Sequence, residues 1–562
     1  MEVLKKDDIK IFTVGSGTNS TEIQSLPRYR MWPLVYILYN KTNLYVGETV
    51  DIKTRLNNHG NNDSKRALNN KLIITSEYFN KSVTLQLEAY LIEYFSGDGK
   101  FRMVNGNLGL TKHNYYNQGF YENVFPEVWR ALREFNISQH TIGQIENEDL
   151  FKYSPYKSLN LDQQEAIINV LRALRENKEN IFIKGGAGTG KTILAIYLMK
   201  LLCTPVDEID PNELDDSFSN EILDLTRDIQ ILYPDLQNQI ALVVPMPPLR
   251  KTLAKVFRNV RNLSAKMVVS PTDAGKRSYN ILIVDESHRL KRRVNIVNYK
   301  SHDDMNKSLN LKNGDELDWI LKRSKSRVFF YDKMQSIRPS DILEEKFESI
   351  LEMPSTISLQ LQSQIRSKGG DLYSDFVYNL MYAKLRPAEQ FVSDHYEIQL
   401  IDKMEDLDKI IKEKNSEYGL ARLVAGFAWE WKSKKDRFKH DFEIENIKLR
   451  WNGTNIDWIN SENAINEVGC IHTTQGYDLN YAGIIFGSEI GYDSVSKKIV
   501  VKPENYKDKN GKKGVEQKDL EGFITSIYQT LLLRAIKGTY IYCCDPSLKV
   551  YFKEHLTLRP NV

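Results

Sequence analysis

Residues Gly185 to Thr192 read GGAGTGKT, so four glycines, among them Gly185, Gly188 and Gly190, precede Lys191 and Thr192. The apolar run NIFIK precedes this segment, and the apolar helical pattern ILAIYLMKLL follows it. Glycines let backbone N–H groups converge on phosphates, the amine of Lys191 reaches the β- and γ-phosphate oxygens, and the hydroxyl of Thr192 holds Mg²⁺. The segment therefore predicts a phosphate loop that binds ATP.

Further along the chain, the segment YNILIVDESH places Asp285 and Glu286 directly after an apolar strand. One carboxylate in such a pair can take Mg²⁺, and the next can orient the attacking water. Asp285 therefore joins Thr192 as a predicted magnesium ligand, and Glu286 is predicted to be catalytic in hydrolysis.

The chain has 562 residues, which indicates roughly three or four domains. Hydrophobic residues make up 41% and charged residues 27%, and no apolar run approaches the ~20 residues that span a bilayer. The N-terminus lacks the apolar core of a signal peptide, so we expect a cytoplasmic protein with no membrane partner. A net charge of +3 does not decide for or against nucleic acid, which needs only a local basic stripe.

Strands that alternate with helices must position these residues. From Asn180 onward, the apolar runs NIFIKG, QIALVVP, YNILIVDE and SRVFFYD are separated by helical patterns. This succession implies a parallel sheet built from βαβ units. The fold class is therefore multidomain α/β.

Seven segments follow one another in an order that resembles superfamily 1 helicases: LNLDQQEAI, GGAGTGKT, VDESH, YDKMQSI, LQSQIRS, HTTQGYD and LLLRAIKG. The resemblance covers Leu159 to Asp545 and implies two RecA-like lobes, placed at 158–350 and 351–562, with the nucleotide between them. More narrowly, ARLVAGFAWEW and GCIHTTQGYD resemble a bacterial family of helicase-like ATPases related to the helicase-like part of Schlafen proteins.

The helicase resemblance assigns further residues to the nucleotide. Gln163 would contact the adenine edge, because an amide both donates and accepts hydrogen bonds. Gln335 would sense the γ-phosphate and couple it to the nucleic-acid groove. Gly476 and Asp478 would touch the nucleotide from the second lobe, Asp478 through the ribose.

Two arginines of the second lobe complete the set that the resemblance implies. Arg366 and Arg534 would close on the γ-phosphate as arginine fingers, since a planar guanidinium matches phosphate geometry. The chain departs from the helicase pattern at Leu533, where threonine is common, and at Gln475, where lysine is common. These departures keep ATP hydrolysis as the expectation and leave unwinding, translocation on one strand and an ATP-driven switch as alternatives.

A second group of reactive residues lies near the N-terminus. The apolar runs LVYILY and NLYVGE are joined by the polar NKTN, which predicts a β-hairpin. Asp51 is a good N-cap and Gly60 a good stop for a helix, and a second helix is expected from Ser82 to Gly97. The segment is therefore a small α+β unit.

Six positions of this unit resemble, in order, the motif residues of GIY-YIG nucleases: Tyr36, Tyr45, Arg55, His59, Glu88 and Asn105. The match spans Leu34 to Leu110, and we place the domain at 30–112, followed by a linker or helical connection at 113–157. Leu34 stands where the family has its first glycine.

The set suits phosphodiester hydrolysis. Glu88 would hold one Mg²⁺ or Mn²⁺ that polarises the scissile phosphate, and Arg55 would stabilise the developing charge. Tyr36 would take or relay the proton of the attacking water with help from His59. Asn105 would order the loop around the metal.

Together these features predict an ATP-dependent nucleic-acid enzyme that joins an endonuclease to a superfamily 1 ATPase. By analogy we expect defence against phage or plasmids, acting on DNA. Three alternatives stay open: a nucleic-acid-binding ATP switch with an inactive nuclease fold, an RNA-directed nuclease, and a DNA-repair helicase-nuclease. The sequence leaves open a homo-oligomer or a protein partner.

Overall fold

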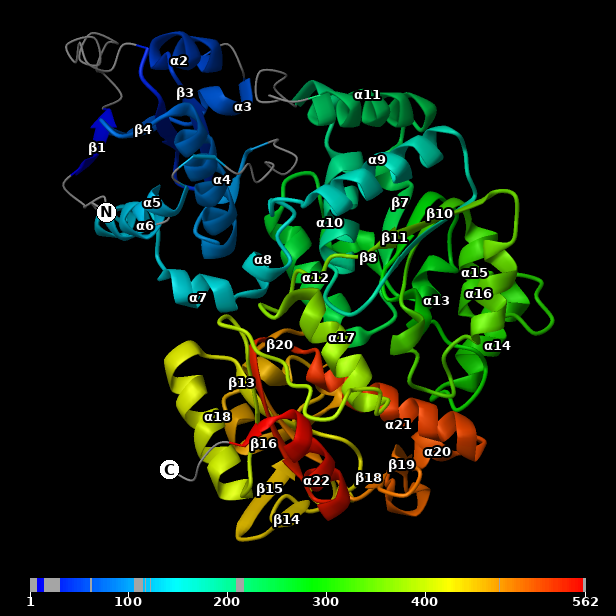
Figure 1. Cartoon of the computed structure of the whole chain (residues 1–562). Helices are drawn as coiled ribbons and strands as arrows, with labels where there is room; N and C mark the ends of the chain where they lie inside the picture. Colours follow the sequence, from blue (N-terminus) through cyan, green and yellow to red (C-terminus); the bar gives the residue numbers. More distant parts are fainter. Residues whose placement is uncertain are drawn as a thin grey trace. The chain divides into compact units, whose positions relative to one another are not determined.

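The computed structural model describes residues 8–14, 31–60, 63–105, 115–116, 118–121, 123–208, 217–474 and 476–558 (Figure 1). The chain divides into two compact units. The first unit runs through Arg175 and adds Ile193–Asn238 and Leu253–Val268; the second comprises Glu176–Thr192, Gln239–Thr252 and Val269–Val562. Among the helices of the described ranges, none combines the length and apolar character needed to cross a membrane.

The front of the first unit is a five-stranded sheet in the order β1-β4-β2-β3-β5. Its strands are β1 (Ile9–Val14), β2 (Leu34–Tyr39), β3 (Asn43–Thr49), β4 (Asn70–Ser76) and β5 (Arg102–Met103). β2 and β3 form the predicted antiparallel hairpin, and the side chain of Asn40 closes its turn by accepting hydrogen bonds from the backbone N–H groups of Thr42 and Asn43. Because β1 pairs with β4, the sheet begins before residue 30, the predicted start of the domain.

Helices cover this sheet and extend its core. They are α2 (Ile52–Gly60), α3 (Asp63–Arg66), α4 (Lys81–Asp98), α5 (Gln118–Tyr121), α6 (Val124–Glu134), α7 (Ile142–Asn147) and α8 (Asp149–Lys152). Asp51 accepts a hydrogen bond from the Thr54 N–H, as the predicted cap requires, and α4 ends at Gly99 in a left-handed conformation. Trp129 and Ile145 are buried in the same cluster as Val46 and Leu87, so the helices at 113–157 belong to the front core and are more than the predicted connection.

The first RecA-like sheet has six strands in the order β11-β6-β10-β9-β7-β8. They are β6 (Asn180–Gly185), β7 (Ile240–Val243), β8 (Val268–Val269), β9 (Tyr279–Val284), β10 (Ser324–Tyr331) and β11 (Thr356–Leu361). β11, β6, β10, β9 and β7 run parallel, and every residue of β9 is buried, as apolar runs of this kind predict. Because β11 pairs with β6, this lobe extends beyond the predicted boundary at residue 350.

The second sheet has eight strands in the order β14-β15-β16-β13-β17-β20-β12-β21. They are β12 (Glu397–Leu400), β13 (Ala421–Ala425), β14 (Phe442–Ile444), β15 (Ile447–Trp451), β16 (Glu467–Cys470), β17 (Leu479–Phe486), β20 (Ala535–Cys543) and β21 (Thr557–Leu558). All neighbours run parallel except β14 and β15, which form an antiparallel hairpin at one edge. A separate hairpin joins β18 (Ile490–Asp493) to β19 (Lys498–Val501).

The remaining helices alternate with these strands, which confirms the multidomain α/β class. The α-helices are α9 (Leu161–Arg175), α10 (Lys191–Cys203), α11 (Ser217–Leu232), α12 (Pro247–Asn259), α13 (Pro271–Ala274), α14 (Tyr299–Ser308), α15 (Glu316–Arg323), α16 (Glu344–Leu351), α17 (Gly370–Met381), α18 (Met404–Tyr418), α19 (Ile471–Thr474), α20 (Lys509–Lys512), α21 (Gln517–Leu532) and α22 (Pro546–His555). Short 3-10 turns include η7 (Ser287–Arg289) and η8 (Lys333–Gln335).

Candidate functional site

The phosphate loop joins the end of β6 to the start of α10, as its flanking sequence predicts. Gly188 and Gly190 have φ angles of 86° and 82°, a region that only glycine adopts without strain. A Cβ atom on Gly188 would lie 1.9 Å from Oε1 of Gln364, so this position also needs glycine for space. The loop therefore has the backbone conformation of an anion cradle.

Lys191 lies inside this loop. Its Nζ donates hydrogen bonds to the carbonyls of Gly185 at 2.6 Å and Gly186 at 2.7 Å, and it lies 3.5 Å from Oδ2 of Asp332. The side chain is only 6% exposed. A buried ammonium in this position is placed to meet phosphate oxygens that enter the loop.

Thr192 and Asp285 meet at the neighbouring strand end. Oγ1 of Thr192 donates to Oδ2 of Asp285 at 2.8 Å, and Asp285 is fully buried. Burial, and then the adjacent Glu286, raise the pKa of Asp285 above its usual value. A hydroxyl and a carboxylate are ligands that Mg²⁺ prefers, and a cation here would favour the ionised form of this buried acid. The donor set thus fits magnesium.

Glu286 follows with a left-handed backbone, φ 51°, and Oε2 of its side chain lies 2.8 Å from Nε2 of His288. Burial opposes its ionisation, but His288, Lys191 and Arg534 outweigh burial and lower its pKa. An ionised carboxylate at this place can orient a water. His288, which directly follows Ser287 in VDESH, is a partner that the motif contained and that we did not assign.

A buried series of polar contacts leads from the phosphate loop to the second lobe. Gln335 donates from Nε2 to Oδ2 of Asp332 at 2.6 Å, and its Oε1 accepts from Nη2 of Arg534 at 3.2 Å. Arg534 is 2% exposed and also reaches the carbonyl of Tyr477 at 3.5 Å. Asp332 directly follows β10, just as Asp285 directly follows β9, so the same strand-end signal would have identified it.

The segment before Arg366 also touches the phosphate loop. Nε2 of Gln364 donates to the carbonyl of Ala187 at 2.6 Å, and the backbone N–H groups of Ile365 and Arg366 donate to the carbonyl of Gly188. The guanidinium of Arg366 pairs with Asp478, with Nε 2.5 Å from Oδ1. Arg366 and Asp478, which we predicted to contact the nucleotide independently, therefore form an ion pair with each other.

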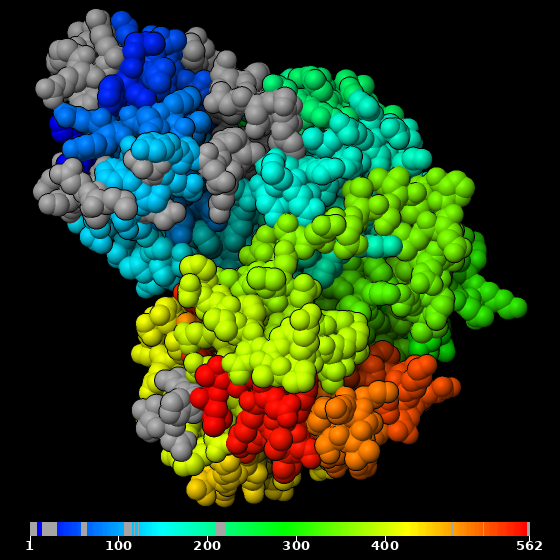
Figure 2. All heavy atoms as spheres, in the orientation of Figure 1, coloured from blue at the N-terminus to red at the C-terminus, as the bar shows by residue number. Residues whose placement is uncertain are grey.

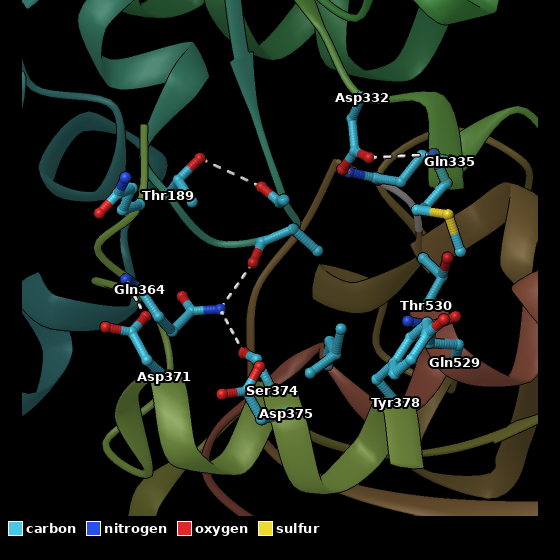
Figure 3. Close-up of a pocket in the computed structure, with 15 residues that line it drawn as sticks. Thr189, Asp332, Gln335, Gln364, Asp371, Ser374, Asp375, Tyr378, Gln529 and Thr530 are labelled. Atoms are coloured by element: carbon cyan, nitrogen blue, oxygen red, sulfur yellow. Dashed lines mark hydrogen bonds between the residues drawn. The ribbon is translucent and has the colours of Figure 1, made fainter. Parts of the chain in front are cut away.

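These contacts surround a cavity of about 470 Å³ (Figure 3). Thr189 and Gln364 lie on one side of it, Asp332 and Gln335 lie on the other, and Gln529 and Thr530 reach it from α21. The cavity is polar where the predicted γ-phosphate sensor and the phosphate loop face it, which suits a nucleotide.

Two predicted nucleotide contacts have other neighbours. Gly476 has a φ angle of 90°, and a Cβ there would lie 3.4 Å from Met246 and 3.5 Å from Leu249. Oε1 of Gln163 accepts a hydrogen bond from the N–H of Asn160 at 3.2 Å, so this amide caps the start of α9. Gln163 belongs to the first unit, and its contact with adenine stays a prediction. Gln475, which stands where superfamily 1 helicases commonly have lysine, lies outside the described residues.

The front site begins with two buried tyrosines on the β2–β3 hairpin. The ring centroids of Tyr36 and Tyr45 lie 6.1 Å apart, and Tyr36 is directly opposite Gly47 in the ladder. A Cβ on Gly47 would lie 2.4 Å from the Tyr36 hydroxyl oxygen, so glycine makes room for the Tyr36 ring. Nε of Arg55, on α2, donates to this hydroxyl at 3.3 Å. Three of the six predicted residues therefore lie together.

Asn105 bonds to the same hairpin. Its Oδ1 accepts from the N–H of Val46 at 3.1 Å, and its Nδ2 donates to the carbonyl of Val46 at 2.7 Å. These two hydrogen bonds to β3 hold the chain that follows β5 next to Tyr45. An ordering role for Asn105 agrees with these contacts, whereas a role around a metal stays a prediction.

Glu88 is buried on α4, which packs along β3 and β2. One turn earlier, Oγ1 of Thr84 donates to Oε2 of Glu48 at 3.4 Å, and Lys81 pairs with Glu48. Lys65, which no motif indicated, lies with its Nζ 4.1 Å from the centroid of the Tyr45 ring. His59 is part of α2, but its side chain lies outside the described residues.

The donor set for a front-site metal is small. Within the described ranges, no three His, Cys, Asp or Glu side chains gather closely enough to hold an ion. Glu88 thus offers one carboxylate, which fits a cation whose other ligands are water and substrate phosphate. A single divalent ion held by Glu88 stays a prediction.

Comparisons with known proteins identify two domains in this chain. A family model described as the GIY-YIG catalytic domain matches residues 33–98, and one described as Schlafen group 3, DNA/RNA helicase domain, matches residues 178–545. A protein of Saccharomyces cerevisiae named Uncharacterized protein YPL245W is 25% identical over 453 residues, covering 72% of this chain and 91% of its own length.

Two solved helicase structures show low overall similarity. Pif1 from Bacteroides, in complex with ADP-AlF3 and ssDNA, is 11% identical with a TM-score of 0.29, covering 72% of this chain and 95% of that chain. Arterivirus nonstructural protein 10 is 11% identical with a TM-score of 0.28, covering 68% of this chain and 64% of that chain. The helicase family model covers more than half of the chain, so the protein belongs to the Schlafen group 3 DNA/RNA helicase domain family and carries a GIY-YIG catalytic domain in front of it.

Proposed function

We propose that this chain is an ATP-dependent nucleic-acid-processing enzyme that joins a metal-dependent endonuclease to a superfamily 1 type ATPase. The observation that carries the proposal is the buried series of contacts from Lys191 through Asp332 and Gln335 to Arg534. It gives a γ-phosphate sensor a direct partner in the second lobe, which is what a nucleotide-driven motor or switch needs. The family of the helicase domain supports nucleic acid as the substrate.

In the ATPase, each residue has a separate task. Lys191 binds the phosphates, and Thr192 and Asp285 would hold Mg²⁺, which neutralises charge on the transferred phosphoryl group when bound. Glu286, ionised beside His288, orients the attacking water. Arg534 stabilises the transition-state charge and, through Gln335, links that charge to the second lobe. Arg366 has a nucleotide role only if it releases Asp478.

In the nuclease, Glu88 would hold the divalent ion that polarises the scissile phosphate. Arg55 contacts the Tyr36 hydroxyl, and this placement suits Tyr36 to take or relay a proton while the guanidinium stabilises the phosphate. His59 would assist. A single site of this kind cuts one strand at a time, so cutting both strands would need a homo-oligomer, a protein partner or two successive nicks.

We place the enzyme in the cytoplasm, in defence against phage or plasmid DNA. The support is the fusion itself, because a motor gives a nuclease a means to select where or when it cuts. RNA is the alternative substrate, and matched DNA and RNA strands in the same assay distinguish the two.

The proposal is tested with Glu88→Ala and Lys191→Ala in the full chain. Loss of the metal ligand should lower cleavage by about 10³-fold with ATP hydrolysis retained. Loss of the loop lysine should lower ATP hydrolysis by at least about 10²-fold, because a preorganised charge on the phosphates is removed. Measurements are cleavage of labelled DNA and RNA with Mg²⁺ or Mn²⁺ and release of phosphate from ATP.

Exposed residues of the same type serve as controls. Glu77 is exposed in the first unit, and Lys409 is exposed on α18. The variants Glu77→Ala and Lys409→Ala should therefore behave as wild type. If Glu88→Ala cuts as well as wild type, the nuclease assignment is wrong. If wild type hydrolyses no ATP with any single-stranded nucleic acid present, the motor assignment is wrong.

A further inference from the structure

The loop between β13 and β14 carries a cluster of basic residues and one exposed aromatic ring that neither site uses. We call residues 429–440, WEWKSKKDRFKH, the 429–440 loop. Its exposed basic residues are Lys432, Lys434, Lys435, Arg437 and Lys439. Only Lys439 has a near acid, with its Nζ 3.9 Å from Asp436, and no acidic side chain of the described ranges pairs with Lys434, Lys435 or Arg437. The loop therefore has a strong local positive charge in a chain that is nearly neutral overall.

Phe438 stands among these basic groups and is 89% exposed. A second aromatic residue, Trp431, is half-buried, and the Nζ of Lys434 lies 5.7 Å from its ring centroid. Basic groups that alternate with accessible rings suit a single nucleic-acid strand, because the cations neutralise phosphates and the rings stack on bases.

The loop is held in a defined shape. The carboxylate of Asp441 accepts hydrogen bonds from the N–H of Ser433 and the N–H of Trp451, each at 2.8 Å, and from the Ser433 hydroxyl. Backbone bonds from Lys435 and Asp436 to the carbonyl of Lys432 form a turn ahead of Phe438. A preorganised loop presents its charges and its ring without first having to be ordered by a ligand.

The loop is placed on the outside of its lobe. It leads into β14, which with β15 forms the edge hairpin of the eight-stranded sheet. Figure 1 draws the two strands at the bottom of the view, and in Figure 2 gold atoms of this part of the sequence form the lower surface. Lys448 and Arg450 on β15 are also exposed, and Nε of Arg450 donates to the carbonyl of Lys439 at 3.3 Å. In the ladder, however, Lys448 lies directly opposite the exposed Glu443 and Arg450 lies opposite Glu467, so the uncompensated positive charge belongs to the loop itself.

Aromatic contacts connect the loop to the nucleotide site. The rings of Trp431 and Trp451 lie 5.8 Å apart, those of Trp451 and Phe427 lie 5.4 Å apart, and Phe427 lies 5.4 Å from His472 on α19. The chain after α19 supplies the Tyr477 carbonyl that Arg534 contacts and the Asp478 carboxylate that Arg366 contacts. A ligand on the loop would thus bear on residues next to the predicted γ-phosphate site.

From these observations we infer that the 429–440 loop is a single-strand nucleic-acid contact of the second lobe, with Lys434, Lys435 and Arg437 on the phosphates and Phe438 stacked on a base. The inference rests on the proposed function. An anionic membrane would also attract basic residues, but one exposed phenylalanine buries little apolar surface in a bilayer, and the aromatic contacts lead to the motor site.

The test compares two triple variants with the same change in charge. Lys434→Glu/Lys435→Glu/Arg437→Glu removes the loop cations, and Lys403→Glu/Lys409→Glu/Lys412→Glu changes exposed lysines at and on α18 of the same lobe. The probe is a fluorescein-labelled single-stranded oligothymidine. We expect the Kd of the loop variant to rise by about 10²-fold and its salt slope to fall by about 2, because counterion release at three phosphates is lost. The α18 variant should stay within about twofold of wild type, since changes in charge away from the contact are screened.

The ring is tested with Phe438→Ala and Phe438→Trp. Removing one stacked ring should raise the Kd by about fivefold or more, whereas tryptophan should bind as tightly as phenylalanine. Equal thermal unfolding of the four variants and wild type confirms that folding is not the cause.

Each outcome decides the inference. Unchanged oligothymidine binding by the loop variant, with tight binding by wild type, overturns it and leaves the proposed function intact. Equal weakening by both triple variants also overturns it, because only overall charge would matter. Binding to phosphatidylserine vesicles that is lost in the loop variant, with oligothymidine binding retained, assigns the loop to membranes instead. Absence of oligothymidine binding in wild type contradicts both this inference and the proposed nucleic-acid function.

Discussion

The two sites of this chain are built in different ways. The motor site, by which we mean the phosphate loop with Asp285, Glu286, Asp332, Gln335 and Arg534, draws its residues from segments far apart in the sequence. Gln335 and Arg534, for example, are separated by 199 positions and share a hydrogen bond. The front site takes all its residues from Tyr36 to Asn105. Its contacts are one between the Tyr36 and Tyr45 rings, a hydrogen bond from Arg55 to Tyr36, and two hydrogen bonds between Asn105 and the backbone of Val46. The motor site joins polar and charged side chains from distant segments to one another, whereas each of these front-site contacts is made to the β2–β3 hairpin.

This difference has consequences for function. Lys191, Asp332, Gln335 and Arg534 each touch the next, so a nucleotide that displaces one of them must change the partners of the others. Such a set suits a site that opens and closes. In the front site, Asn105 and Gly47 fix distances along a sheet, which suits chemistry that needs one fixed geometry.

We expect the largest loss of activity when the series of contacts from Lys191 to Arg534 is interrupted. Arg534→Ala removes a guanidinium from a buried position and leaves the oxygen of Gln335 without its donor, so we expect ATP turnover to fall by about 10³-fold or more. Arg366→Ala removes a group already paired with Asp478, and we expect a smaller loss of about tenfold. The measurement is steady-state phosphate release with saturating oligothymidine.

Arg534→Lys serves as the control, because it keeps the charge and loses the planar fork. It should recover only a minor part of the activity. Comparable losses for Arg534→Ala and Arg366→Ala would contradict the distinction that we draw between the two arginines.

Much of the motor site could be predicted from sequence because each segment carries its own local signal. Glycines mark the phosphate loop, and an apolar strand followed by Asp285 and Glu286 marks the strand end where we predict magnesium. The pairs that these side chains form could not be predicted. Arg366 and Asp478, for example, are far apart in the sequence, and only the three-dimensional fold brings them into contact. Nucleotide contacts for these residues, for Gly476 and for Gln163 stay predictions.

The fold was predicted better in its strands than in its boundaries. The hairpin, the helices after it and the parallel sheet follow from apolar periodicity, and the structure confirms them. The helices at 113–157 were assigned to a connection, although Val128, Trp129 and Leu132 recur at helical spacing and are buried. Strand order also places β11 in the first lobe, and no local pattern reveals sheet order.

A smaller effect is expected from the front site, where geometry is set by space. Gly47→Ala places a Cβ against the Tyr36 hydroxyl, so the ring must move and its contact with Arg55 must change. A misplacement of a catalytic group by about 1 Å can lower turnover by about 10²-fold. We expect cleavage of labelled DNA to fall by about that factor while ATP hydrolysis stays at the wild-type rate.

Gly119→Ala provides the matched control, because a Cβ at Gly119 meets no atom of the described residues within 4 Å. It should cut as wild type does. Full cleavage by Gly47→Ala would show that the position of Tyr36 is not critical and would weaken its assigned role in proton transfer.

The smallest effect concerns a buried acid outside both sites. Glu489 is fully buried, and its Oε1 accepts a hydrogen bond from the Tyr528 hydroxyl at 2.7 Å. Burial raises its pKa to about 7, in contrast to Glu286, whose pKa is lowered by His288, Lys191 and Arg534.

Because the pKa of Glu489 is higher in the folded chain than in the unfolded chain, the folded state keeps, between about pH 4.5 and 7, a proton that the unfolded state has lost. Stability of the second lobe should therefore fall over that window, by up to about 3 kcal/mol, and level off above it. Glu489→Gln keeps an acceptor for Tyr528, carries no charge and should remove this fall, so that the variant unfolds at higher urea than wild type at pH 8. Tryptophan fluorescence in urea at several pH values measures the difference. The exposed Glu462→Gln should retain the wild-type slope. An equal slope in Glu489→Gln would contradict a raised pKa of Glu489.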